Sequence, residues 1–412
     1  MKIAIFVASF PILSETFILN QITGLIKRGH NIEIYAWSRH HNDKIHEIVS
    51  QYRLLDHTHF LDDHPTNNIL RLLKIIHLIL RNIICFRFST LFITLKLFRN
   101  RRHAANLGMP FLDVLNAADL LHQQQPDVIH CQFGSLGPRG LLLKKIGAST
   151  AKLITSFRGA DTTGYVNENP GIYDELFVSG DLFLPVCNAL GLRLIKLGCD
   201  ENRIKVHHSG VDLKNFKYAK RDHLNNNHDK VNLLTVARLV EKKGIAFAIR
   251  ASAHLISLGY DINHIVAGDG ELRNELEQLI SDLGIDKNIQ MCGWKNHDEI
   301  IQLLDETHIL VAPSITAKSG DQEGIPNVVK EAMAMGIPVV STLHGGIPEL
   351  VDDGVSGFLV PECDADAIAE SLRYLIDHPD KWNEMGYAGR KHIEADFDIE
   401  SLNDQLVALY KS

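Results

Sequence analysis

The chain has 412 residues, of which 45% are hydrophobic and 22% are charged, and its formal net charge at pH 7 is -8. This length can bury an extensive core and favours two or three domains over one. The acidic balance argues against a dedicated nucleic-acid-binding protein, because such proteins usually carry a strongly basic face.

The cysteines and the first residues both indicate a reducing compartment. The six cysteines form no CxxC pair and no His/Cys cluster with metal-ligand spacing; they are Cys85, Cys131, Cys187, Cys199, Cys292 and Cys363. Reduced thiols in a cytoplasmic protein are the simplest interpretation. The start, MKIAIFVASFPILSE, is apolar over too short a run for a secretory signal and predicts a first buried strand.

Strand-like and helix-like segments alternate through the first half of the chain. Residues 2–8 have strand character, residues 16–30 show helical apolar spacing, and residues 31–37 return to strand character. Further strands are predicted at 127–133, 151–157 and 182–187, with helices at 136–147 and 188–198. This alternation predicts a parallel, doubly wound sheet with helices on both faces.

A second alternating series follows a polar segment at residues 218–232 that has the composition of a linker. Its strands are predicted at 231–239, 262–270, 288–294, 308–314, 336–342 and 357–361, with helices such as 244–259 and 271–284 between them. The sequence therefore predicts an α/β fold of two Rossmann-like domains that face each other across a cleft, where ligands are expected. We expect domains at 1–215 and 216–395, and a terminal helix at 396–412 that packs back on the first domain.

The segment GDQEGIPNVVKE, residues 320–331, combines a helix start with two carboxylates. Pro326 suits the first position of a helix that ends near Gly336, and the free N–H groups at 327–329 suit a phosphate. Glu323 precedes this helix and Glu331 lies inside it, so an elongated ligand with hydroxyl-rich ends, such as a nucleotide sugar, would lie between the two carboxylates. The alternative is a capping loop with a solvent-facing glutamate in the helix.

Two cations and two glycines add to this constellation. In TVARLVEKKGI, Arg238 ends a strand and Lys243 follows five residues later, a position where two cations can neutralise a diphosphate. Alone, such cations usually belong to a solvated surface. AGDGELR, residues 267–273, places Gly268 and Gly270 in a strand-turn-helix junction, which is weak evidence because tight turns need glycine in any case.

Together these segments resemble a known family. The segments ARLVEKKG, AGDGELR, EGIPNVVKEAMAMGIPVV and GGIPELVDDGVSGFLV, found in order across residues 231–362, resemble the donor domain of retaining GT-B glycosyltransferases of family 4. TAKSGDQEGIPN and SFPILSETFI resemble the bacterial exopolysaccharide branch that includes colanic-acid transferases. The resemblance implies a GT-B fold and a hexosyltransferase that uses a nucleotide sugar, with a UDP-sugar favoured, and no cofactor or bound metal.

The resemblance also implies roles for individual residues. Arg238 and Lys243 would bind the donor diphosphate, Glu323 the hydroxyls of the transferred sugar, and Glu331 the ribose. Backbone at the remaining donor positions would approach sugar and phosphate; these are Gly324, Ile325, Pro326, Asn327, Gly268 and Gly270. In this family the acceptor is thought to attack on the front face, with the leaving phosphate helping to remove its proton. A covalent glycosyl-enzyme is possible but not required. Asp321 beside Glu323 falls far short of a metal-coordination set.

The acceptor side is expected in the first domain. Ser14 and Glu15, in the loop after the first strand, either contact the acceptor or cap the next helix; this loop lacks the double glycine of many relatives. Arg158 is expected to bind the acceptor, but it stands where family members commonly have a histidine, which leaves its exact role open. Asp161 at the later polar position is expected to be catalytic. His130, at a strand end, is either an acceptor contact or a buried structural histidine.

Residues 64–112 contain no Asp or Glu but include eight basic residues: Arg71, Lys74, Arg81, Arg87, Lys96, Arg99, Arg101 and Arg102. No apolar run there reaches the roughly 18 residues of a membrane span. A basic and strongly apolar segment suits an anionic bilayer surface, contacted through residues 71–102, although a helical insertion packed on the first domain is the alternative. Peripheral binding at the inner face of the plasma membrane would bring the enzyme to a polyprenyl-diphosphate-linked saccharide acceptor.

Two other classes of protein are weighed against a glycosyltransferase. A nucleotide-dependent oxidoreductase should show GxGxxG after its first strand and an acidic residue about twenty positions later, and VASFPILSE does not. An inactive glycan-binding or scaffold protein of GT-B fold would keep the sheets and lose the charged set. Arg238, Lys243, Glu323 and Glu331 are all present, which disfavours it.

Overall fold

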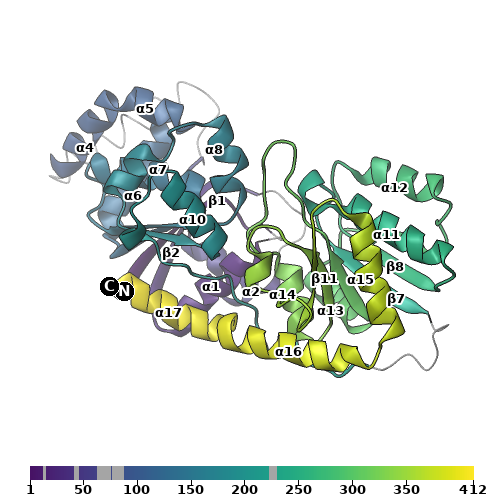
Figure 1. The fold of residues 1–412 in the computed structure, drawn as a ribbon. Coiled ribbons are helices and arrows are strands. Elements are labelled where there is room, and N and C mark those ends of the chain that lie inside the picture. The colour runs from purple at the N-terminus through teal and green to yellow at the C-terminus, as the bar shows by residue number, and fades with distance from the viewer. Residues whose placement is uncertain (13–14, 41–45, 63–75, 77–87, 222–229) are drawn as a thin grey trace.

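The computed structural model describes residues 1–412 apart from 13–14, 41–45, 63–75, 77–87 and 222–229. Two six-stranded sheets occupy separate halves of the molecule, and neighbouring strands of both pair in parallel (Figure 1). This arrangement confirms the predicted α/β fold.

The first sheet has the strand order β3-β2-β1-β4-β5-β6, with the bounds Lys2–Phe10 (β1), Asn31–Arg39 (β2), Thr58–Phe60 (β3), Val128–Cys131 (β4), Lys152–Phe157 (β5) and Leu182–Pro185 (β6). The second sheet has the order β12-β11-β10-β7-β8-β9, with the bounds Val231–Val236 (β7), Ile262–Ala267 (β8), Ile289–Gly293 (β9), Ile309–Ala312 (β10), Val339–Thr342 (β11) and Gly357–Val360 (β12). In both sheets the order reverses next to the first strand of the domain, which is the usual ligand position of such folds.

Helices connect the strands in both halves. In the first half they are α1 (Thr16–Lys27), α2 (Glu47–Gln51), α4 (Phe88–Arg99), α5 (Arg101–Asn106), α6 (Phe111–Gln124), α7 (Gly137–Lys145), α8 (Gly164–Glu168), α9 (Asp174–Ser179) and α10 (Asn188–Lys196). In the second half they are α11 (Ile245–Ser257), α12 (Arg273–Asp282), α13 (His297–Asp305), α14 (Asn327–Ala334), α15 (Ala365–Asp377), α16 (Lys381–Asp396) and α17 (Ile399–Lys411). Short 3-10 turns lie at Leu54–His57 (η1), Gly134–Leu136 (η2), Ala160–Thr162 (η3), Glu201–Arg203 (η4), Glu241–Lys243 (η5) and Ile347–Glu349 (η6).

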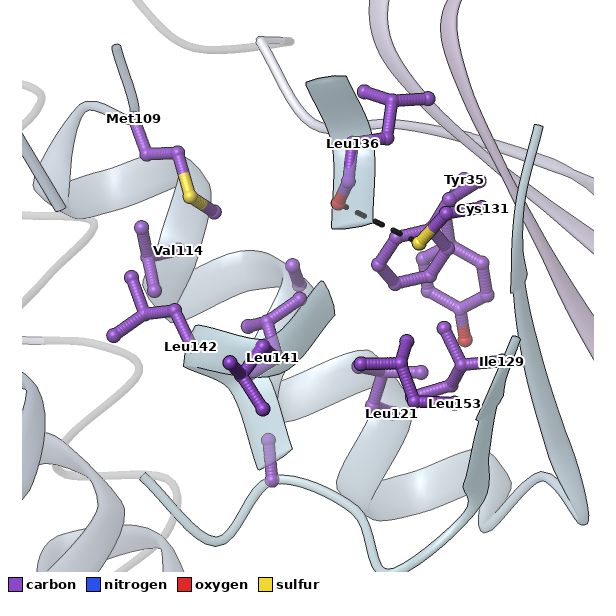
Figure 2. Close-up of a cluster of buried hydrophobic side chains, with 14 of the residues drawn as sticks. Tyr35, Met109, Val114, Leu121, Ile129, Cys131, Leu136, Leu141, Leu142 and Leu153 are labelled. Carbon is purple, nitrogen blue, oxygen red and sulfur yellow. Dashed lines mark hydrogen bonds between the residues drawn. The ribbon is translucent and has the colours of Figure 1, made fainter. Parts of the chain in front are cut away.

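Each face of the first sheet is buried by helices. Along β1, Ala4 and Phe6 point into one apolar cluster, whereas Ile3, Ile5 and Val7 point into the other. Figure 2 shows part of the first cluster, where side chains of β2, β4 and β5 meet those of α6 and α7; among them are Tyr35, Leu121, Ile129, Cys131, Leu141, Leu142 and Leu153. Burial on both faces explains why these strands read as nearly continuous apolar runs.

The chain passes back to the first domain at its C-terminal end. α16 packs against α14, and α17 packs against α1, so these two helices run along both halves of the molecule and bring the two termini close together (Figure 1). Arg28, the C-cap residue of α1, fixes α17 through Glu400 at 3.0 Å and Asp404 at 2.6 Å. The terminal helix therefore links the two halves mechanically.

The basic segment is partly described. Arg71, Lys74, Arg81 and Arg87 lie outside the described residues, whereas α4 and α5 carry Lys96, Arg99, Arg101 and Arg102. α4 packs on α6 and buries Ile93 and Leu97 in the core of the first domain. Among the helices of the described ranges, none is long and apolar enough to cross a membrane.

Candidate active site

The charged residues of the second domain meet because β7 and β10 are neighbours in the sheet. The turn η5, with Lys242 and Lys243, follows β7, and the loop with Glu323 runs between β10 and α14. Gly244 lets the two approach: its φ is 61°, and a Cβ there would lie 1.9 Å from the carbonyl oxygen of Pro313. The carboxyl edge of the sheet thus brings together groups 80 positions apart in sequence numbering, at 243 and 323.

Lys243, Lys242, Asp321 and Glu323 form an ion cluster at this edge. The Lys243 Nζ lies 2.9 Å from Glu323 Oε2, and the Lys242 Nζ lies 3.3 Å from Glu323 Oε1. Lys242 also contacts Asp321 Oδ2 at 3.0 Å. The Glu323 side chain is only 13% exposed, so these charges lie where water screens them weakly.

The cluster keeps Glu323 ionised. Burial acts to raise the pKa of Glu323, but the charges of Lys243 and Lys242, together with their hydrogen bonds, outweigh burial and lower the pKa to about 2. Glu323 is therefore an acceptor-only carboxylate at neutral pH, which is the form that suits hydroxyl groups of a ligand.

The helix after this loop begins one residue later than predicted. α14 starts at Asn327, and Pro326 is its N-cap residue because its ψ of 129° is extended rather than helical. The side chain of this N-cap residue makes no capping hydrogen bond to the first turn. Gly324 is buried against the first domain, where a Cβ would lie 2.7 Å from the carbonyl oxygen of Arg158. Ile325 packs against Val186, Cys187 and Leu190, so Gly324 and Ile325 lie where the two domains meet, directly before Pro326 and Asn327.

Glu331 lies inside α14 and is partly buried. Burial raises its pKa to about 7, although the neighbouring Lys330 lowers it in part. Lys330 is fully buried and donates to the Ser209 carbonyl oxygen at 2.6 Å. A carboxyl group that lacks full hydration is prepared to accept hydrogen bonds from ligand hydroxyls.

The remaining donor candidates lie at the ends of β7 and β8. Arg238 is exposed, and its side chain has no ion pair within the part of the chain that the structure describes. Gly268 and Gly270 pack against this strand end: Cβ atoms there would lie 1.8 Å from the Ala237 carbonyl oxygen and 2.6 Å from that of Leu239. These glycines permit close packing beside Arg238.

Loops from the carboxyl ends of both sheets touch each other. Thr163 donates to Asp321 Oδ1 at 3.3 Å, and the Gln322 N–H donates to the Thr163 hydroxyl at 3.3 Å. Glu349 of η6 accepts from the backbone N–H groups of Asn188 at 2.8 Å and Ala189 at 3.0 Å, at the start of α10. The ion cluster is therefore bounded by the first domain.

Arg158 is the central cation on the first-domain side. Its guanidinium donates to the Gln132 carbonyl oxygen at 2.9 Å, to Gln132 Oε1 at 2.7 Å and to the Ser209 hydroxyl at 2.8 Å. It also stacks 4.2 Å from the centre of the Phe17 ring. Burial lowers the pKa of Arg158 to about 10, so the group stays charged at neutral pH.

Asp161 uses both of its carboxylate oxygens within its own surroundings. They accept hydrogen bonds from the backbone N–H groups of Gly134 at 2.8 Å, Arg158 at 2.9 Å and Gly159 at 2.9 Å. The residue is 6% exposed. Its carboxylate therefore organises the two loops that follow β4 and β5.

His130 is fully buried, and both of its ring nitrogens are engaged. Nδ1 lies 2.7 Å from the Tyr410 hydroxyl of α17, and Nε2 lies 2.8 Å from the Ser156 hydroxyl. Of the two alternatives for this residue, the geometry favours a structural histidine that fixes α17 to the sheet.

The loop after β1 is described in part. Ser14 lies outside the described residues. Glu15 is the N-cap residue of α1 but makes no capping hydrogen bond with its side chain. It is partly buried, and burial raises its pKa to about 7, against the opposing effect of Arg158.

Two residues of this site, Lys242 and His344, were not identified from the sequence. Lys242 adjoins Lys243, and only the 3-10 turn η5 directs both ammonium groups to the same carboxylate. His344 lies after β11, and its Nε2 is 3.0 Å from the backbone nitrogen of Glu323. A histidine before the paired glycines of HGGIPE was the available hint.

Known proteins are similar to this chain over its whole length. The family model described as Glycosyl transferases group 1 matches residues 216–392, and the model described as Glycosyltransferase Family 4 matches residues 14–215. The putative colanic acid biosynthesis glycosyltransferase WcaL of Salmonella typhimurium is 34% identical over 416 residues, covering 100% of both chains. The amylovoran biosynthesis glycosyltransferase AmsK of Erwinia amylovora is 34% identical, covering 99% of each chain.

Solved structures are similar over the whole fold. Anabaena Alr3699/HepE in complex with UDP and glucose has a TM-score of 0.74 at 19% identity, covering 100% of this chain and 99% of that chain. Sucrose-phosphate synthase of Thermosynechococcus elongatus has a TM-score of 0.73 at 18% identity, covering 100% and 98%. These likenesses confirm the predicted GT-B fold. With the family models and the full-length relatives, they show that the chain belongs to glycosyltransferase family 4, a family of retaining enzymes.

Proposed function

We propose that this glycosyltransferase moves a hexose from a nucleotide sugar, with a UDP-sugar favoured, to a polyprenyl-diphosphate-linked oligosaccharide in exopolysaccharide or capsule biosynthesis. The observation that carries the proposal is the Lys243–Glu323 ion pair, 2.9 Å long, beside the uncapped start of α14. The relatives named for colanic acid and amylovoran biosynthesis support the pathway class.

The donor would lie along the start of α14. Its diphosphate would meet Lys243, the exposed Arg238 and the N–H groups of the first helical turn, which together supply positive charge. Glu323 would accept hydrogen bonds from the transferred sugar, and Glu331 from the ribose. Lys243 is paired with Glu323, and the diphosphate would compete for this cation.

The reaction would break the bond between the anomeric carbon and the donor phosphate oxygen. The electron pair of that bond leaves with the nucleoside diphosphate, and the acceptor hydroxyl oxygen forms the new bond on the same face of the sugar. The proton of that hydroxyl passes to the leaving phosphate. Positive charge held in advance beside the leaving group is usually the largest source of rate enhancement in such steps.

The first domain would supply the acceptor site. Glu15 and Arg158 lie at the carboxyl ends of β1 and β5, and each is partly buried. Asp161 would act through the loops that it holds rather than by touching the sugar, since its oxygens are bonded to backbone N–H groups.

Membrane contact would occur through α4. Three large apolar side chains point away from the core, with exposed fractions of 63% for Phe92, 65% for Leu95 and 57% for Phe98. Their spacing of three residues places them along one side of the helix. The basic residues of α4 and α5 flank them, so the chemistry fits an anionic lipid surface, where apolar insertion and charge attraction add.

A donor screen tests the proposed function. UDP- and GDP-sugars are added to the purified protein, and both thermal stabilisation and slow release of nucleoside diphosphate are measured. We expect one nucleotide sugar to raise the melting temperature and to be turned over. A protein that binds nucleotide sugars without turnover, even with lipid-linked acceptor present, would instead be a binding or scaffold protein of GT-B fold.

A further inference from the structure

His344 is buried between Glu323 and Glu362, two carboxylate residues on different loops. Its side chain is fully buried, and it follows β11. Nε2 lies 3.0 Å from the backbone nitrogen of Glu323, and Nδ1 lies 2.7 Å from Glu362 Oε1. The ring therefore joins the donor-site loop to the segment after β12.

The partners fix which ring nitrogen carries the proton. The Glu323 N–H is a donor, so Nε2 must be the acceptor and carry no proton. Nδ1 then bears the proton of the neutral ring and donates it to Glu362 Oε1. In a doubly protonated ring, or in the other tautomer, the Nε2–H of His344 would face the backbone N–H of Glu323, and neither donor would have an acceptor there.

Glu362 is itself anchored to the other end of the same loop. Its Oε2 accepts from the Thr316 N–H at 2.6 Å, and its Oε1 lies 3.3 Å from the Thr316 hydroxyl. Burial acts to raise the pKa of Glu362, but the hydrogen bonds from His344 and Thr316 outweigh it and lower the pKa. The loop is thus held at Thr316 and at Glu323 by one His–Glu pair.

We propose that the His344–Glu362 pair is the positioning device for Glu323, which it holds in the orientation that meets the transferred sugar. His344 acts through the backbone of Glu323, and Glu362 acts by fixing the tautomer of His344. This inference rests on the proposed role of Glu323 as the sugar-binding carboxylate. It assigns no contact between His344 and the substrate.

Two substitutions separate the contacts of the ring. An asparagine amide ends near the Nδ1 position, so His344→Asn can keep the link to Glu362 and loses the acceptor for the Glu323 N–H. A glutamine amide reaches the Nε2 position, so His344→Gln can restore that acceptor. We expect kcat to fall about ten- to one-hundredfold in His344→Asn, because a buried donor is left unpaired, and to recover substantially in His344→Gln.

A third substitution tests the tautomer. The amide of Glu362→Gln has one oxygen for two donors, the Thr316 N–H and the His344 Nδ1–H, so the ring is expected to change tautomer or the loop to lose its anchor. The matched control is His254→Asn, which changes an exposed histidine of α11 in the same domain. The affinity for UDP without sugar, measured by thermal stabilisation, should stay within about twofold of wild type in all variants, because Lys243 and α14 are unchanged.

The tautomer itself is measured in the wild-type protein by NMR of 15N-labelled histidine, with the His344 signals assigned by their loss in His344→Gln. We expect the Nδ1–H form in wild type and a shift toward Nε2–H in Glu362→Gln. Wild-type His344 in the Nε2–H form, or a folded His344→Asn variant with unchanged kcat, would overturn the proposal. If wild type binds no nucleotide at all, the proposed function fails instead, and the NMR result still decides the tautomer.

Discussion

At the junction of the two domains, the ion cluster of the second domain pairs charged groups with one another, whereas Asp161 and Arg158 of the first domain are bonded to backbone and neutral polar groups. Lys242 and Lys243 share Glu323. Asp161, in contrast, accepts from three backbone N–H groups, and Arg158 donates to a carbonyl, an amide and a hydroxyl.

This difference in bonding affects how each domain can respond to a charged ligand. An ion pair can exchange one partner for a charged ligand at small net cost, because the ligand brings its own opposite charge. A carboxylate that satisfies several buried N–H groups cannot leave them without exposing unpaired donors. The ion cluster of the second domain is therefore suited to the proposed binding and release of an anionic donor, and the bonds of Asp161 and Arg158 to a fixed shape of the proposed acceptor site.

The largest expected effect comes from breaking the ion cluster. Lys243→Ala and Glu323→Ala should each lower kcat by about 10²- to 10³-fold, the range found when one preorganised charged contact to a transition state is removed. The measurement is transfer activity with the nucleotide sugar identified by the donor screen, at saturating donor concentration.

Exposed residues of the same domain provide controls for these variants. Lys287→Ala and Glu275→Ala remove the same charges from α12 and the loop that follows it, and should leave activity within about twofold. Full activity in either folded cluster variant would remove Lys243 or Glu323 from the donor site.

In the first domain, a substitution at Asp161 should lower the stability of the fold rather than the rate of the chemical step. Asp161→Asn places an amide NH2 group against backbone donors, and a buried donor without an acceptor costs on the order of 1–3 kcal/mol. We expect thermal unfolding at lower temperature, with UDP still bound by the folded protein, and Asp174→Asn, an exposed aspartate in α9, as the neutral control. A variant with wild-type stability and no transfer would instead place Asp161 in the chemistry.

The two domains also differ in how far their sequence predicted their site. The fold followed from apolar runs alone, because parallel strands buried on both faces leave a strong pattern. Arg238, Lys243, Glu323 and Glu331 were predicted as donor-site residues from their spacing and from the family resemblance, and the structure places Lys243 and Glu323 in direct contact.

Residues of the first domain gave the same strand-end signal but are used differently. His130 follows the same rule of position as Lys243, yet it points into the sheet toward Tyr410, a residue 280 positions away. Sequence spacing cannot report a contact made by a helix that returns from the far end of the chain. The His344–Glu362 pair was not predicted either. His344 accepts from the backbone N–H of Glu323 in another loop, and sequence spacing does not report such a contact.

A smaller effect is expected at α4, the helix that we propose contacts the membrane. The triple variant Phe92→Ser, Leu95→Ser and Phe98→Ser should weaken co-sedimentation with vesicles of anionic phospholipid by about tenfold or more, since each large apolar side chain contributes roughly 1.5–3 kcal/mol when fully buried. Activity on a short, water-soluble acceptor should be retained.

A matched triple variant separates membrane binding from a general loss of apolar surface. Val178, Leu258 and Val355 are exposed to 77%, 53% and 50% and lie outside α4 and α5. Their replacement by serine should leave vesicle binding unchanged. Equal binding by both triple variants would contradict the contact through α4.

The smallest effect concerns Glu331, whose pKa is raised to about 7 by burial. In the unfolded chain a glutamate has a pKa of about 4.3, so between these values the folded state binds a proton that the unfolded state has lost, and stability falls as pH rises through this window. Glu331→Gln is neutral throughout, so the full shift would give it about 3 kcal/mol over wild type at pH 8 relative to pH 4.5. Because Glu331 is only partly buried, solvent screening should reduce this gain to on the order of 1 kcal/mol.

Denaturant unfolding at both pH values measures this gain, with Glu275→Gln, an exposed glutamate of α12, as the control. If Glu331 accepts hydrogen bonds from the ribose, Glu331→Gln should also bind UDP more weakly at pH 8, although its fold is more stable at that pH. The burial of the charged carboxylate would then lower the stability of the fold but serve the binding of the ligand. An equal stability difference between Glu331→Gln and wild type at both pH values would mean that the carboxylate is hydrated in the folded protein. Glu331 would then not differ from other hydrated carboxylates of the second domain.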